Sequence, residues 1–195
     1  MTIRERISDS TAMAMTKFFR FFADTFFAKR YGHRAVVLET IAGVPGMVGG
    51  MFLHMRSLRK MERGNGHMIQ ELLDEAVNER KHLMFFIEIA QPNWFERRLI
   101  FVAQFVFFFF YAFMYIFFTR TAHKMIAYFE EEAVRSYTNY LELIKNHQIK
   151  NVDAPQIAIE YYNLKKDAKL SDMVKCVRDD EAKHASANHR FADKY

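Results

Sequence analysis

The sequence is poor in residues that crosslink or interrupt a chain. Its 195 residues include one cysteine, three prolines and seven glycines. The single cysteine, Cys176, excludes an internal disulfide and any metal site built on a Cys-x-x-Cys pair. No stretch alternates convincingly between apolar and polar residues with a period of two, so we expect no β-sheet. These absences favour a chain of long helices.

Runs of like charge are also missing. Lys and Arg together number 28 and Asp and Glu 23, a net charge of +5, but no basic and aromatic residues alternate as they do on nucleic-acid surfaces. We therefore predict no nucleic-acid partner and interpret the basic excess as attraction to anionic membrane lipid. The opening MTIRERISDS lacks the apolar core of a secretory signal, and its Glu5 and Asp9 argue against a mitochondrial presequence.

Apolar residues, by contrast, are abundant: 51% of the chain is hydrophobic, and 21 residues are phenylalanine. Residues 99–118, LIFVAQFVFFFFYAFMYIFF, are long enough for a helix that spans a bilayer. Residues 12–29 predict an amphipathic helix, with Lys17, Arg20 and Asp24 on one face and phenylalanines on the other. Further helices are predicted over 33–60 (interrupted by GVPGMVGG at 43–50), 67–90, 95–118, 121–147, 155–165 and 169–192. We find no repeat or linker and expect one domain over 1–195, with an N-terminal arm and amphipathic helix over 1–30 and a bundle over 33–192.

Two Glu-x-x-His motifs point to the chemistry. NERKH holds Glu79 and His82, DDEAKH holds Glu181 and His184, and a spacing of three puts each pair on one helix face. A single such pair is typical of a solvated helix face, but both pairs here share stripes with apolar residues. A buried carboxylate is costly unless it binds a metal or shares a proton.

A di-iron carboxylate bundle needs these two motifs and one Glu from each of two further helices. In FEEEAVRSY, helical spacing puts Glu130 on a core face, Glu131 on a solvated face and Glu132 at the edge between them. In VLETIAGVPGMVGG the candidate is Glu39, although a tight helix crossing with an incidental glutamate explains that segment about as well. Taken together, the pattern predicts a non-haem site for two iron ions with six ligands: Glu39, Glu79, His82, Glu130, Glu181 and His184.

The expected metal site constrains whether the apolar stretch 99–118 can cross the membrane. Two ligand helices precede it and two follow it, so a single crossing would leave half of the ligands on each side of the bilayer, roughly 30 Å apart. No second apolar stretch of that length brings the chain back. We therefore predict an all-α, ferritin-like four-helix di-iron bundle with additional membrane-associated helices that lie in one leaflet, a monotopic arrangement.

With these motifs in place, the sequence resembles the alternative oxidase family. LET, NERKH, EEEAVRSY and DEAKH occur in that family's order and at its spacing, IAGVPGMVGG and NHRFAD match its flanking stretches, and the resemblance runs from about residue 15 to the end. It implies a membrane-bound, cyanide-insensitive oxidase that takes electrons from ubiquinol and reduces O₂ to water at two irons without pumping protons. The six residues above match the family's iron ligands.

The resemblance also implies roles for other residues. Tyr137 matches a tyrosine near the iron pair, Asn78 and Asp180 match positions that orient the ligand histidines, and His123 and Tyr161 match the same polar network. The quinol pocket maps to Arg20, Arg34, Leu38, Glu132, Ala133 and Ser136. The residues themselves explain Arg20 equally well as a side chain that reaches lipid phosphate. Glu132, about 200° round the helix from Glu130, suits proton relay without binding iron.

A homodimer is expected as well. Met47, Met51, His54, Met55 and Leu58 form a stripe away from Glu39, with Arg59 and Arg80 nearby. Packing within one bundle explains this stripe equally well, and it is the resemblance that favours a dimer.

Some positions depart from the family pattern. Ser136 stands where threonine is usual, Lys183 replaces a commonly acidic residue, and Tyr162 stands where tryptophan is usual, which puts a transfer role there in doubt. The regulatory N-terminal cysteine of plant members has no counterpart, so control through it is not expected. The short N-terminus favours a bacterial inner membrane protein on the cytoplasmic face or, in a eukaryote, one on the matrix face of the mitochondrial inner membrane.

Two alternatives stay open. One is a di-iron hydroxylase of quinone biosynthesis, against which EEEA and the LET–GVPGMVGG segment favour the oxidase. The other is a non-catalytic, ferritin-like iron-binding membrane protein, which predicts iron binding without quinol-dependent oxygen uptake.

Overall fold

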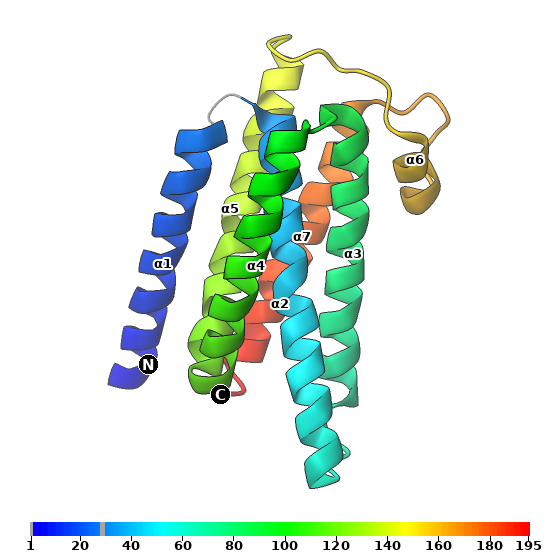
Figure 1. Ribbon diagram of the computed structural model, residues 1–195. Helices are drawn as coiled ribbons and strands as arrows, with labels where there is room; N and C mark the ends of the chain where they lie inside the picture. The colour runs from blue at the N-terminus through cyan, green and yellow to red at the C-terminus, as the bar shows by residue number, and fades with distance from the viewer. Residues whose placement is uncertain (1, 28–29) are drawn as a thin grey trace.

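A computed structural model describes residues 2–27 and 30–195 of the chain, and these residues are almost entirely helical (Figure 1). The helices are α1 (Ile3–Phe27), α2 (Tyr31–Lys60), α3 (Gly66–Ala90), α4 (Trp94–Phe117), α5 (Thr119–Lys145), α6 (Gln156–Tyr162) and α7 (Leu170–Ala192). Within the described residues the only β-type pairing is an isolated bridge between Asp153 and Lys169. The all-α prediction is therefore confirmed. The helix expected over 12–29 begins earlier, at Ile3, and its last two residues, 28 and 29, lie outside the described residues.

The interruption predicted in the second helix is wrong. α2 runs without a break through GVPGMVGG, with Pro45 buried inside it. The glycines serve close packing instead, because a Cβ at Gly46 would lie 2.3 Å from the carbonyl oxygen of Leu72 on α3. A proline inside a helix costs about 3 kcal/mol, and most helix stability in proteins comes from tertiary packing. The extensive contact of α2 with α3 is thus the physical reason that the helix continues.

Four helices form a bundle, and the others cover two of its sides. α2 packs mainly on α3 and α5 mainly on α7, while α1 and α4 lie against the α2–α5 side and α6 contacts α3 and α7 (Figure 1). A large apolar core surrounds the middle of the bundle, with Phe85, Phe86, Met173 and Val174 fully buried. The bundle therefore brings together faces of four helices that are far apart in the sequence.

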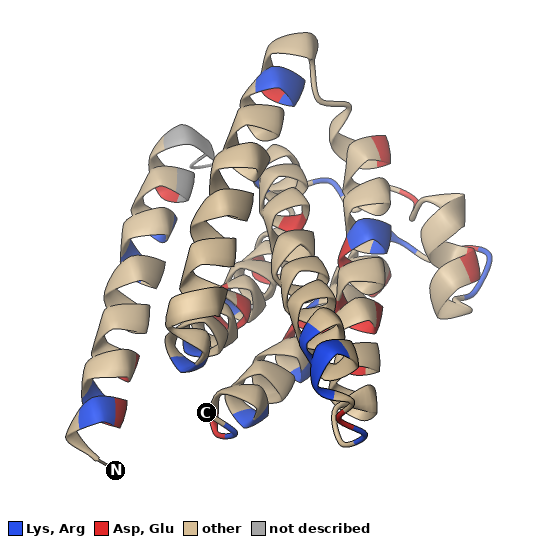
Figure 2. Cartoon of the chain, turned by 60° about the horizontal axis from the view of Figure 1, so that its bottom comes forward, with Lys and Arg blue, Asp and Glu red and all other residues tan. Residues whose placement is uncertain are grey.

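α4 has one buried side and one exposed apolar side. Asn93 and Glu96 begin the helix with a capping box, and Tyr111 and Tyr115 are buried on its inner side. Its outer side exposes Phe101, Phe105, Phe109, Phe113, Phe117 and neighbouring aliphatic residues. Figure 2 shows no charged residue on α4 beyond its first turns. The expectation that no second apolar stretch is long enough to cross a membrane is wrong, because by length and composition α2 qualifies as well as α4; the apolar part of α2, however, is 56% buried and that of α4 only 22%. The apolar surface available to lipid is therefore on α4.

α1 is fixed to the bundle by polar contacts with α5. The hydroxyls of Ser8 and Thr121 are hydrogen bonded at 2.8 Å, and Arg120 forms an ion pair with Asp9 at 2.7 Å. Ala12 is fully buried in an apolar cluster with residues of α2, α4 and α5, whereas Phe18, Phe21 and Phe22 on α1 are exposed. α1 thus adds a second exposed apolar surface on the side of the bundle that carries α4.

Candidate metal centre

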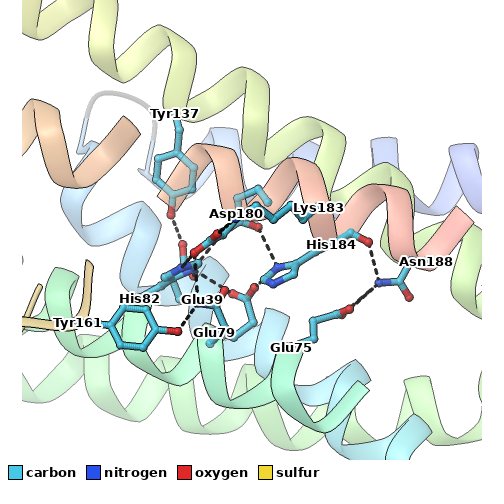
Figure 3. Close-up of polar contacts among 12 residues, drawn as sticks. Glu39, Glu75, Glu79, His82, Tyr137, Tyr161, Asp180, Lys183, His184 and Asn188 are labelled. Atoms are coloured by element: carbon cyan, nitrogen blue, oxygen red, sulfur yellow. Dashed lines mark hydrogen bonds and ion pairs between the residues drawn. The ribbon is translucent and has the colours of Figure 1, made fainter. Parts of the chain in front are cut away.

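The six residues expected to bind iron converge at the middle of the bundle, and Figure 3 labels four of them, Glu39, Glu79, His82 and His184. α2 supplies Glu39, α3 supplies Glu79 and His82, α5 supplies Glu130, and α7 supplies Glu181 and His184. All six are buried, with exposed fractions between 0 and 9%. Each lies on the apolar face that helical spacing indicated, which is why four carboxylates meet where water is excluded.

These residues form two overlapping groups of possible ligands. Glu39, Glu79, His82 and Glu181 make up one group, and Glu79, Glu130, Glu181 and His184 the other. Within each group one ligand atom per residue lies within 4.8 Å of all the others. Glu79 and Glu181 belong to both groups, so they stand where bridging ligands between two metal ions would be. The remaining residues give each metal position one further glutamate and one histidine.

The donor atoms are short of hydrogen-bond partners, which fits a bound metal. His184 Nδ1 lies 2.7 Å from Glu79 Oε1, and His82 Nδ1 lies 3.2 Å from Glu181 Oε1. None of these four buried atoms makes a contact with hydrogen-bond geometry, and the same holds for Glu39 Oε2. Buried polar groups are nearly always hydrogen bonded. Donor atoms that converge without such bonds are therefore well suited to coordinate cations.

The protonation behaviour of the site reflects its crowding. Burial, followed by repulsion from Glu181, raises the pKa of both Glu39 and Glu130 well above its usual range. Burial opposes ionisation of Glu79 too, but contacts with the two histidines hold its pKa well below the usual value. Burial disfavours the charged imidazole of His184, yet its contact with Glu79 raises the pKa to about 9. Without metal the site retains protons, so metal binding must displace them.

Tyr162 and Asp180 orient His82, one of the candidate ligands. Its Nε2 lies 2.9 Å from the Tyr162 hydroxyl, which donates a hydrogen bond to Asp180 Oδ2 at 2.9 Å. Because that hydroxyl gives its own proton to Asp180, it accepts from Nε2–H, which leaves Nδ1 facing the cluster as the nitrogen that a metal would bind. Partners of this kind fix the tautomer of a ligand histidine. The sequence put a role for Tyr162 in doubt, because tryptophan is usual at that position. In the structure Tyr162 contacts His82 directly and positions its ring.

Tyr137 contacts the site from α5. Its hydroxyl donates a hydrogen bond to Glu39 Oε1, and its ring stacks on Phe86 with the ring centres 5.6 Å apart. Tyr137 thus lies beside one of the residues expected to bind iron.

The other expected polar residues fall into two separate networks. Asn78 donates to the Tyr161 hydroxyl at 2.8 Å and to Asp180 at 3.3 Å, at the partly exposed edge of the site. His123 lies elsewhere, fully buried, with its Nδ1 3.0 Å from Asn188 Oδ1. Hence His123 and Tyr161 do not share one network, and among the residues described it is His82, not His184, that contacts the group around Asp180.

Asn188, the partner of His123, was not among the residues that the sequence predicted for the site. Asn188 donates to both carboxylate oxygens of the buried Glu75, at 3.1 and 3.0 Å (Figure 3). The signal was present in the spacing, because Glu75 stands four residues before Glu79 and Asn188 four residues after His184. Both residues extend the ligand faces by one helical turn.

An apolar cavity of about 640 Å³ leads from α1 and α4 to the ligands. Its inner end reaches Glu39, Glu130 and Glu181. The expected pocket residues that line it are Arg20, Arg34, Leu38, Glu132 and Ala133, whereas Ser136 is not part of its lining. Arg20 forms an ion pair with Glu132, and Arg34 with Asp24.

Comparisons with known proteins match nearly the whole of this chain. A family model described as alternative oxidase matches residues 2–193. The mitochondrial ubiquinol oxidase of Batrachochytrium dendrobatidis is 53% identical over 188 residues, covering 96% of this chain and 59% of that protein. Mitochondrial ubiquinol oxidase 1c of Arabidopsis thaliana is 50% identical, with 96% and 56% covered, and mitochondrial ubiquinol oxidase 2 of Glycine max is 47% identical, with 98% and 57% covered. The chain thus spans less than two thirds of the length of these relatives.

Proposed function

The chain belongs to the alternative oxidase family, and on that premise we propose that it oxidises ubiquinol and reduces O₂ to water. The observation that carries this proposal is the pair of overlapping ligand groups that share Glu79 and Glu181. Two irons held there would supply the one-electron steps that couple a two-electron donor to the four-electron reduction of oxygen. The relatives' names support an oxidase over a quinone hydroxylase or an iron-binding protein without turnover.

Ubiquinol binds, in this proposal, in the apolar cavity between α1, α2, α4 and α5. The cavity joins an exposed apolar surface to three of the ligand carboxylates, so a lipid-soluble ring can approach the metal pair without crossing water. The Arg20–Glu132 ion pair lies in its wall and offers a donor for the ring oxygens and an acceptor for a quinol proton. Leu38 and Ala133 line the space for the ring.

The membrane arrangement follows from the same surfaces. α1 and α4 together expose phenylalanines on one side of the bundle, and all four ligand helices lie together beside them. This supports a monotopic protein whose α1 and α4 enter one leaflet of a respiratory membrane. We propose the matrix face of the mitochondrial inner membrane, since the relatives are named as mitochondrial proteins, or the cytoplasmic face of a bacterial inner membrane. It does not pump protons.

We further propose a homodimer through α2 and α3. Met47, Met51 and Leu58 are exposed on α2, and Leu73 and Val77 on α3, which leaves an apolar surface on the bundle. A dimer mass in mild detergent is expected, and Met51→Glu should reduce it to a monomer. A monomeric mass for the unaltered chain would contradict the proposal.

The function is tested with two variants on opposite sides of the cavity. The purified chain should consume oxygen with a reduced quinol, in the presence of cyanide, and the quinol should be recovered as quinone. Arg20→Ala should raise the KM for quinol or lower turnover while two irons remain bound. Glu130→Ala should lose iron as well as turnover. Iron binding without quinol-dependent oxygen uptake would exclude the oxidase, and normal quinol oxidation by Arg20→Ala would exclude this entry route.

A further inference from the structure

A second cavity, of about 480 Å³, reaches the metal centre from the side of the bundle that carries α3, α6 and α7. Most of its lining residues are charged or polar, among them Glu71, Asp74, Glu75, Asp180, Lys183 and His184, and we call it the polar cavity. A water molecule occupies about 30 Å³ in the liquid, so the cavity has room for several. Asn78 Oδ1, also in the wall, is buried without a hydrogen-bond partner among the described residues, which is the kind of atom that an internal water satisfies.

Three carboxylates on α3 lead from the surface to the ligands along this cavity. Asp74 is exposed, the side chain of Glu71 is 29% exposed, and Glu75 is only 4% exposed. His184, at the inner end, belongs to both the cavity wall and the ligand set. Among the described contacts, no hydrogen bond or ion pair joins Glu75 to any of the six ligands, and its carboxylate lines the cavity, where water can reach it.

Asn188 holds Glu75 in place. Its Nδ2 donates to both Glu75 oxygens and to the backbone carbonyl of His184 at 3.1 Å. Its Oδ1 then has to accept from Nδ1–H of His123. The side-chain amide of Asn188 therefore cannot flip without losing its bonds to Glu75, His184 and His123. The buried carboxylate is therefore fixed one helical turn from the ligands.

The surroundings of Glu75 favour proton exchange near neutral pH. Burial raises the pKa of Glu75 to about 7. The titratable groups that act on it are Glu79 from its own helix, His184 and Glu181 from α7, Glu130 from α5 and Tyr111 from α4. A carboxyl group that both gains and releases protons at the working pH is suited to general acid–base transfer.

A route of this kind would serve the proposed reaction in two ways, as an exit for water and as a path for proton exchange. Two ubiquinols release four electrons and four protons, and one O₂ takes up four of each to give two waters. The apolar cavity suits the quinol ring but disfavours water and protons, because an unpaired polar group or charge there is costly. We propose that the polar cavity is the aqueous route to the metal centre, through which water leaves and protons arrive, with Glu75 as the last proton-exchanging group before the ligands. This inference rests on the proposed oxidase function.

Glu75→Gln is the direct test, with Glu88→Gln as its matched control. Glu88 lies on the same helix, is exposed and is outside the cavity. Glutamine still accepts a bond from Asn188 but holds no exchangeable acid. The variant should keep its iron and its KM for quinol, lose turnover on the order of a hundredfold, and become slower in D₂O than in H₂O. Glu88→Gln should behave as the unaltered chain. Unchanged turnover and isotope effect in Glu75→Gln would overturn the role of this residue.

Access to water is tested without turnover. In a Cys176→Ser chain held in lipid vesicles, a thiol introduced by Ala187→Cys in the polar cavity should react with a small, positively charged thiosulfonate reagent. A thiol introduced by Ala103→Cys in the apolar cavity should react with an uncharged maleimide and not with the charged reagent. Protection of the first thiol from the charged reagent would contradict an aqueous route. If the unaltered chain oxidises no quinol, the proposed function fails, and this labelling decides the route by itself.

Discussion

Replacing Tyr162 with phenylalanine should weaken iron binding by roughly 10- to 100-fold, the usual loss when a partner of a metal-binding histidine is removed. The lost hydroxyl lies 2.9 Å from Nε2 of His82, a side chain with no exposed surface. Leaving that N–H buried without an acceptor costs about 1–3 kcal/mol, and a 10- to 100-fold change in affinity corresponds to about 1.4–2.7 kcal/mol, so the two estimates agree. Asp180 Oδ2 is 3.6 Å from the same nitrogen and can approach it to accept the bond instead, which favours the lower end of the 10- to 100-fold range of affinity loss.

The neighbouring tyrosine provides the control. Tyr161→Phe removes a hydroxyl that accepts from Asn78 and contacts none of the six ligands. The assay is the iron retained by each purified variant over a series of chelator concentrations, with turnover measured on the same samples. Tyr162→Phe should release iron at a lower chelator concentration than Tyr161→Phe. Equal retention by the two variants would refute the positioning of His82 by Tyr162.

Three further outcomes are expected. Gly46→Ala should lower the free energy of unfolding by about 1–3 kcal/mol, because its Cβ would lie 2.3 Å from a carbonyl oxygen of α3. Gly43→Ala, whose nearest neighbour would be 3.6 Å away, should not, and equal denaturant midpoints would contradict this packing argument. The metal-free chain should unfold at lower temperature as pH rises from about 7 to about 9. The folded state raises the pKa of His184 from 6.5 to about 9, so the stabilisation that this group gives is lost over that interval; a melting temperature that increases over this range would contradict it. Glu79→Ala should lose most of the bound iron and all turnover, since Glu79 belongs to both ligand groups, and a variant with two irons and full turnover would show that the ligand assignment is wrong.

Much of the fold and of the candidate site could be read from residue spacing. Glu130 is buried at 3% exposure while Glu131, one residue on, reaches outward to His189, as the helical period indicated. The same period selected the faces of Glu79 and Glu181. Local rules failed at GVPGMVGG, where glycine and proline argue for a break but contact with a second helix keeps α2 intact.

The sequence by itself determined which faces of the helices are apolar and which of their acidic and histidine residues lie on those faces, because helical periodicity depends only on order along the chain. The alternative oxidase motifs likewise lie in the order of the residues, and so does the long apolar character of α4. Tertiary structure alone decided which side chains touch across helices. In the folded chain Tyr162 contacts His82, and His123 lies apart from Tyr161. Glu75 is hydrogen bonded to Asn188, which stands 113 positions later in the sequence. It also opened an apolar cavity on one side of the ligands and a polar one on the other, since cavity walls come from several helices and are set by how those helices pack.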